Sequence, residues 1–277
     1  MFLKQGKFLI PIVIVLLIFT SGCEKWRDNR EVVTSSDHML AESIFHEMSR
    51  YVLLMNSSAG LIIADTCVSV TFSDTTYPYV ITIDFGSASC PGFFEAELQG
   101  QVTAAVSGPR ENVGSSISII LDNVSVDGYE ALGTINILSK GSNAAGNLEY
   151  GYKVVDGVIT LIGTKEGDKV SWNCDYNWEL KETGSQPGFV LDDLYIISGS
   201  ASGVNREGKR FTAAIEGSLQ KEIACRWNRS GIVKITPDDL KERTVDFGGE
   251  NCSETSGCCD NLASVEIGRK TYNLNMR

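Results

Sequence analysis

The chain is poor in histidine, proline and positive charge. Among its 277 residues there are two histidines and six prolines, and 24 basic residues stand against 35 acidic ones. Histidine-dependent nucleophilic catalysis is disfavoured, because His38 and His46 lie in one short segment and no Gly-x-Ser-x-Gly motif accompanies them. Nucleic acid is not expected as a partner, because phosphate binding needs clusters of lysine and arginine and the sequence has none.

The chain also lacks the spacings that bind metals. Its clustered cysteines, "CSETSGCCD", contain no paired C-x₂-C unit and no neighbouring histidine, so no zinc site is predicted. The turn at Asp127-Gly128 is not an EF-hand loop, because Thr134 occupies the position of the required glutamate. No cofactor and no catalytic residue is therefore predicted. A glycosidase-like carboxylate pair stays open, because 35 acidic residues allow many pairs.

What is present begins with an export signal. "MFLKQGKFLIPIVIVLLIFTSGC" has Lys4 and Lys7, then an apolar run, then small residues before Cys23. This pattern predicts a signal peptide over 1–22, too short to span a membrane comfortably, and a lipobox in which Cys23 becomes the lipid-carrying first residue. Loss of the two lysines changes the net charge from −11 to −13. The membrane is thus a predicted partner, through the lipid anchor.

One helix is predicted after a tether. Residues 23–36 are polar and show no periodicity, which predicts a tether. Over 37–57, apolar residues recur at helical spacing, with serine or aspartate available as the N-cap, so an amphipathic helix is expected there.

The remainder of the chain, 60–277, alternates between apolar and polar residues. In "VSWNCDYNWEL" one face holds six apolar or aromatic positions and the other face is polar. Turn dipeptides at Asp127-Gly128, Asp156-Gly157, Glu166-Gly167 and Glu207-Gly208 separate such segments. We expect a single all-β domain of twelve or more antiparallel strands, as a multi-stranded sandwich, an open barrel or an elongated roll.

Two segments of this β domain repeat each other. Residues 67–90 and 225–252 each begin and end with cysteine and contain Asp-Phe-Gly six residues before the second cysteine. Asp-Phe-Gly holds magnesium in protein kinases, but the other kinase motifs are missing here. We expect instead a structural role, with Phe85 and Phe247 in the core and Gly86 and Gly248 at positive φ.

With its lipobox and two "DFG…C" segments, the chain resembles a set of uncharacterised β-rich lipoproteins of Bacteroidota. The resemblance covers most of 60–277 and implies attachment to the outer membrane, but it implies no activity. "CEKWRD" matches the surface-export signal of such lipoproteins only in part, so the periplasmic and surface faces both stay open.

Seven cysteines follow Cys23, and disulfides are the default in an exported protein. The repeat favours Cys67 with Cys90 and Cys225 with Cys252. The competing arrangement joins Cys252 to Cys258 or Cys259. An odd count leaves one thiol over, and the candidate is Cys174 on the apolar face of its strand.

Four aromatic residues have two interpretations. Trp172, Tyr176, Trp178 and Trp227 could form a carbohydrate-stacking platform, but their apolar neighbours favour burial in the core.

The resulting expectation is a lipid-anchored, disulfide-stapled protein of the cell envelope that acts as a binding or structural module, with an envelope protein or glycan as partner. It is expected to be a non-enzyme. Two alternatives stay open: a glycan-active enzyme with a carboxylate pair, and a lipid or lipoprotein-handling factor with an apolar cavity or groove.

Overall fold

A computed structural model describes residues 30–57, 67–92, 96–163, 168–182, 190–248 and 259–276. The predicted signal peptide, Cys23, Cys252 and Cys258 lie outside these residues. The described elements are one helix and thirteen strands: α2 (Val33–Met55), β1 (Ser69–Phe72), β2 (Tyr79–Pro91), β3 (Glu97–Val106), β4 (Ser116–Val126), β5 (Tyr129–Ser142), β6 (Leu148–Leu161), β7 (Lys169–Glu182), β8 (Leu194–Val204), β9 (Arg210–Glu222), β10 (Ser230–Pro237), β11 (Arg243–Asp246), β12 (Leu262–Ile267) and β13 (Lys270–Asn275).

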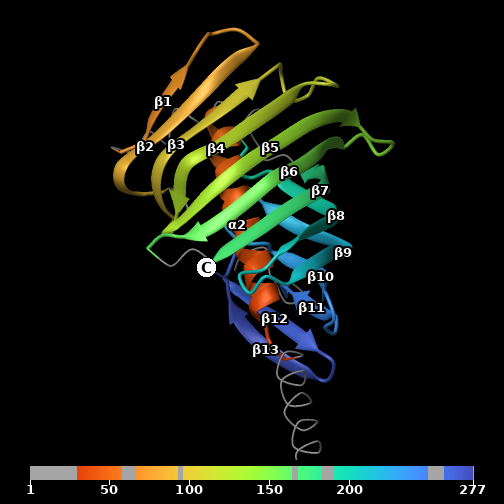
Figure 1. Cartoon of the computed structure of the whole chain (residues 1–277). Helices are drawn as coiled ribbons and strands as arrows, with labels where there is room; N and C mark the ends of the chain where they lie inside the picture. The colour runs from red at the N-terminus through yellow and green to blue at the C-terminus, as the bar shows by residue number, and fades with distance from the viewer. Residues whose placement is uncertain are drawn as a thin grey trace, which may run out of the picture.

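The strands form one antiparallel sheet in sequence order, from β1 at one edge to β13 at the other. The all-β prediction is therefore confirmed, and the arrangement is a single rolled sheet. Figure 1 shows this sheet curling around α2, which runs along its inner side. The two "DFG" segments belong to β2 and β11, toward opposite ends of the sheet.

Helix α2 is longer at its start than predicted and is buried all around. It begins at Val33, so the last residues of the predicted tether are helical. The predicted serine or aspartate N-cap is wrong: Val32 is the N-cap, and the preceding Glu31 carboxylate accepts hydrogen bonds from the Thr34 N–H and hydroxyl at 3.2 and 3.1 Å. Every residue from Thr34 to Met55 except Ser36 is buried. The amphipathic helix predicted over 37–57 is thus a central helix, because the sheet encloses both its apolar and its polar faces.

Several strands are longer than the sequence pattern suggested, because β-bulges interrupt them. Asp127-Gly128 and Glu207-Gly208 are hairpin turns, as predicted. Asp156-Gly157 is not a turn but a bulge inside β6, where the pairing with β7 shifts between Val154 and Gly157. Bulges increase local bending and twist, which lets long strands wrap around a helix.

The two "DFG" segments have the predicted structural role. Phe85 and Phe247 are buried, and Gly86 and Gly248 have φ of 80° and 76°. The aspartate before each phenylalanine accepts a hydrogen bond from the glycine N–H, at 2.8 Å in the first copy and 2.7 Å in the second. The first copy is a bulge within β2, whereas the second follows the end of β11.

One predicted disulfide is confirmed and the other is wrong. Cys67 and Cys90 are bonded, with their Cα atoms 5.8 Å apart. Cys225 is bonded to Cys259, with a Cα separation of 5.4 Å, and not to Cys252. Cys259 returns to Cys225 because it directly precedes β12, which pairs with β11, which in turn pairs with β10.

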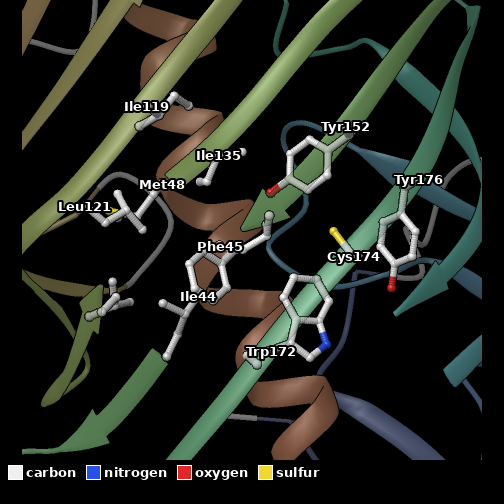
Figure 2. Close-up of a cluster of buried hydrophobic side chains, with 14 of the residues drawn as sticks. Ile44, Phe45, Met48, Ile119, Leu121, Ile135, Tyr152, Trp172, Cys174 and Tyr176 are labelled. Atoms are coloured by element: carbon white, nitrogen blue, oxygen red, sulfur yellow. The ribbon is translucent and has the colours of Figure 1, made fainter. Parts of the chain in front are cut away.

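The apolar face of β7 lies against α2. Trp172, Tyr176 and Trp178 are each at most 2% exposed, so the alternative of a carbohydrate-stacking platform is wrong for these three residues. Figure 2 shows Trp172, Cys174 and Tyr176 beside the helix, and the rings of Phe45 and Trp172 stack with centroids 5.6 Å apart. Cys174 is a buried free thiol, as predicted.

Candidate binding site

Two groups of buried polar side chains stand out in the described structure, one along α2 and one at the end of α2 near Leu53. The group along α2 makes several hydrogen bonds to the sheet and its loops. The Glu42 carboxylate accepts hydrogen bonds from the Tyr176 hydroxyl and the Asn228 amide, both at 2.8 Å. The indole N–H of Trp172 donates to Nδ1 of His38 at 3.0 Å. These bonds join the helix to strands on the second half of the sheet.

Burial lowers the pKa of two basic groups of this network. The pKa of His46 lies well below its ordinary value, first because of burial and then because of the positive charges of Lys221 and Arg50. The pKa of Lys221 is also lowered well below its ordinary value, mainly by burial. Its amino group still donates to the carbonyl oxygen of Arg226 at 2.6 Å. These side chains are at most 7% exposed, so the network joins the helix to the sheet in the interior of the protein.

The second group lines a narrow slot beside Trp178. The slot lies between the segment from Gly108 to Ser116, the end of α2, and strands β4 to β8. It encloses about 420 Å³ of empty space when its open mouth is included, and about 20 Å³ of this is wide enough for the centre of a water-sized sphere. Its walls combine three apolar residues, three aromatic residues, four polar or charged residues and a glycine: Leu53, Ile117, Ile137, Tyr150, Trp178, Tyr195, Arg110, Ser115, Ser116, Ser139 and Gly108.

Three polar atoms in the walls of this slot are buried without a partner. The Tyr150 hydroxyl, the Trp178 indole nitrogen and the Ser139 hydroxyl make no hydrogen bond to any other residue of the described chain. Each of the three residues is at most 5% exposed. Buried polar groups in proteins are rarely left unpaired, and each exception calls for water or a ligand.

An ion pair forms one side of the slot. The Arg110 guanidinium donates to Oδ2 of Asp193 at 2.7 Å, and the Tyr195 hydroxyl donates to the same oxygen at 3.3 Å. Asp193 is fully buried. Burial raises the pKa of Asp193, while the charge of Arg110 opposes this shift. Burial also raises the pKa of Tyr150 to about 12, so its hydroxyl keeps its proton.

The sequence identified only one residue of this slot. Trp178 was among the four candidate aromatics, whereas Trp172 and Tyr176 belong to the core. Trp227 is half-buried and has the Arg226 guanidinium 4.7 Å from its ring centroid. The partners of Trp178 come from distant segments of the chain and carry no common motif. The register of the sheet, the end of α2 and the segment from Gly108 to Ser116 together bring them to one place.

No family model, no curated protein and no solved structure matches this chain. Among the described residues, no helix is both long and apolar enough to cross a bilayer. Within those same ranges, no group of three or more histidine, cysteine or acidic residues is placed to hold a metal ion.

Proposed function

We propose that the protein is a lipid-anchored module of the cell envelope, in the outer membrane, that binds a partner or supports a larger structure. The observation that carries this proposal is that the first described element after the predicted lipid site, α2, is the centre of the fold. Ten Cα-to-Cα steps separate Cys23 from Val33. Fully extended, they span about 35 Å, so the body stays near the membrane.

The start of α2 is held firmly by ion pairs. Arg243, which is buried, donates to the Glu31 carboxylate at 3.0 Å. The Arg206 guanidinium and backbone N–H both donate to Asp37, at 2.7 and 2.8 Å. An anchor attached here pulls on the core of the protein and not on a loosely packed end. This arrangement suits a module that is held at a membrane while its outer sheet face contacts other molecules.

The two alternatives, a lipid or lipoprotein-handling factor and a glycan-active enzyme, have less support than a binding or structural module. A lipid or lipoprotein-handling factor needs an apolar cavity or groove, whereas α2 runs along the inner side of the described sheet. The hollow beside the first turns of α2 is bordered by the charged Arg206 and the polar Asn275 as well as by apolar side chains. A glycan-active enzyme needs a pair of carboxylates facing its substrate. The carboxylates on α2, at Asp37, Glu42 and Glu47, are at most 2% exposed. Each accepts a hydrogen bond from another side chain of the fold, from Arg206, Tyr176 and Arg50 respectively.

Metabolic labelling with a clickable fatty acid, followed by membrane fractionation, tests the anchor. The wild-type chain should carry the label and sediment with membranes, and Cys23→Ala should lose the label. Cys174→Ala, which removes a buried free thiol, is the matched control and should remain labelled. An unlabelled wild type, or a labelled Cys23→Ala variant, would contradict the proposal. Protease treatment of intact cells then distinguishes the surface face from the periplasmic face.

A further inference from the structure

We propose that the slot beside Trp178 is a binding site for an uncharged ligand that inserts a primary hydroxyl group between Trp178, Tyr150 and Ser139. This site is independent of the lipid anchor, so either proposal can fail without the other.

The chemistry of the three unpartnered atoms selects a hydroxyl. The indole N–H of Trp178 can only donate, so the ligand must offer an acceptor. The hydroxyls of Tyr150 and Ser139 can each donate or accept. An alcohol oxygen satisfies such a set, because it accepts from the indole while its own proton goes to a neighbouring hydroxyl. An ether or carbonyl oxygen accepts equally well but has no proton to donate.

The charges around the slot favour a neutral ligand. Arg110 and Asp193 form an ion pair at 2.7 Å, and Glu111 contacts the same guanidinium at 3.3 Å. A carboxylate ligand would meet Asp193 and Glu111, and a cationic ligand would meet Arg110. In a partly buried site, a charged ligand would lose its hydration, and the nearby Arg110 and Asp193 are already paired with each other.

The shape of the slot favours a thin group on a carbon chain. Space for water-sized spheres is only about 20 Å³, which admits a hydroxyl with its carbon but no ring. The side chains of Leu53, Ile117 and Ile137 offer apolar contacts to the carbon atoms behind that hydroxyl. Two sources share this chemistry: the hydroxymethyl group of an envelope sugar and a free aliphatic alcohol.

The test uses the full mature chain in detergent micelles with ¹⁵N-labelled tryptophan. The indole signal of Trp178, assigned with Trp178→Phe, is followed by NMR during titration with 1-butanol, methyl glucoside, butyrate or butylammonium. We expect a saturable shift with 1-butanol, methyl glucoside or both, and none with the two ions of the same chain length. The neutral probe that binds identifies the source.

Variants of two neighbouring tyrosines provide the control. Tyr150→Phe should weaken binding of the neutral probe about fivefold, the loss of one neutral hydrogen bond. Tyr152→Phe, also buried in β6, removes a hydroxyl that is bonded to Ser49 outside the slot and should leave binding unchanged. The proposal fails if no probe shifts the Trp178 signal, which would mean that the slot holds water only. It also fails if the ions bind as tightly as the alcohols, or if Tyr150→Phe binds like the wild type.

Discussion

At the scale of single residues, buried hydroxyls in this protein differ in whether they have partners. Tyr152 and Tyr150 lie two positions apart on the same strand and are both at most 5% exposed. The Tyr152 hydroxyl and the Ser49 hydroxyl are 3.0 Å apart, while the Tyr150 hydroxyl has no partner within the described chain. A buried hydroxyl stabilises a protein only when it is hydrogen-bonded, because its lost hydration has to be replaced.

This difference predicts that replacing the two tyrosines by phenylalanine has different effects on the stability of the ligand-free protein. Tyr152→Phe should lower the free energy of unfolding by about 1 kcal/mol, because it breaks the bond to Ser49. Tyr150→Phe should leave the free energy of unfolding unchanged or raise it slightly, because no protein hydrogen bond is lost. Urea denaturation followed by circular dichroism measures both. Equal destabilisation by the two variants would show that the Tyr150 hydroxyl has a partner, such as bound water.

At the scale of elements, local sequence patterns predicted which segments form strands, but they predicted poorly which elements contact one another. The alternation in β7 predicted its buried face correctly, and the Asp-Phe-Gly repeat predicted the positive φ of Gly86 and Gly248. The bulge at Asp156-Gly157 was taken for a turn, since both are built from the same residue types. The sequence gives no sign that the polar residues of α2 are buried, because their partners are supplied by strands more than a hundred residues away. The slot was missed for the same reason.

Close packing between α2 and β6 leads to a second prediction. A Cβ atom at Gly157 would lie 2.3 Å from the Trp172 carbonyl oxygen and 2.8 Å from the Phe45 ring. Gly157→Ala should therefore lower the free energy of unfolding by about 1–3 kcal/mol through overpacking. On the same strand, a Cβ atom at Gly151 would meet only the flexible Lys140 side chain, at 3.3 Å.

Gly151→Ala is thus the matched control and should change the free energy of unfolding by at most about 0.5 kcal/mol. Thermal unfolding of both variants, monitored by circular dichroism, provides the comparison. If the two substitutions had the same effect, the helix would not pack against β6 as tightly as described.

At the scale of the whole molecule, the described strands form one sheet with no second layer of strands, and this sheet curls around α2. The hydrophobic core is shared between the helix and the inner face of nearly every strand. Charged and titratable side chains that α2 carries are consequently enclosed with it. Stability of the entire fold should then depend on the protonation of groups at its centre, because α2 cannot expose them without leaving the sheet.

The histidines of α2 make this dependence measurable. Burial lowers the pKa of His38 and of His46, while unfolded histidine titrates near 6.5. Below pH 6.5 the unfolded chain therefore binds protons that the folded chain excludes, so stability falls as the pH falls. Each histidine contributes up to about 1.4 kcal/mol per pH unit until its folded pKa is reached. Above pH 6.5 neither state binds the proton, and this contribution disappears.

His46→Gln isolates one of these contributions. Burial raises the pKa of Glu47 and of Asp193, so the folded protein holds those protons more tightly than the unfolded chain. These two carboxyl groups therefore increase stability as the pH falls. They are present in both the wild type and the variant, so the comparison removes their effect. Lys221 and Arg50, whose charges act on His46, are present in both the wild type and the variant. Between pH 7.5 and 5.5, urea denaturation should show a smaller loss of stability in His46→Gln than in the wild type. Parallel pH profiles for the two proteins would mean that His46 accepts a proton inside the folded protein, and that the centre of the molecule is open to water.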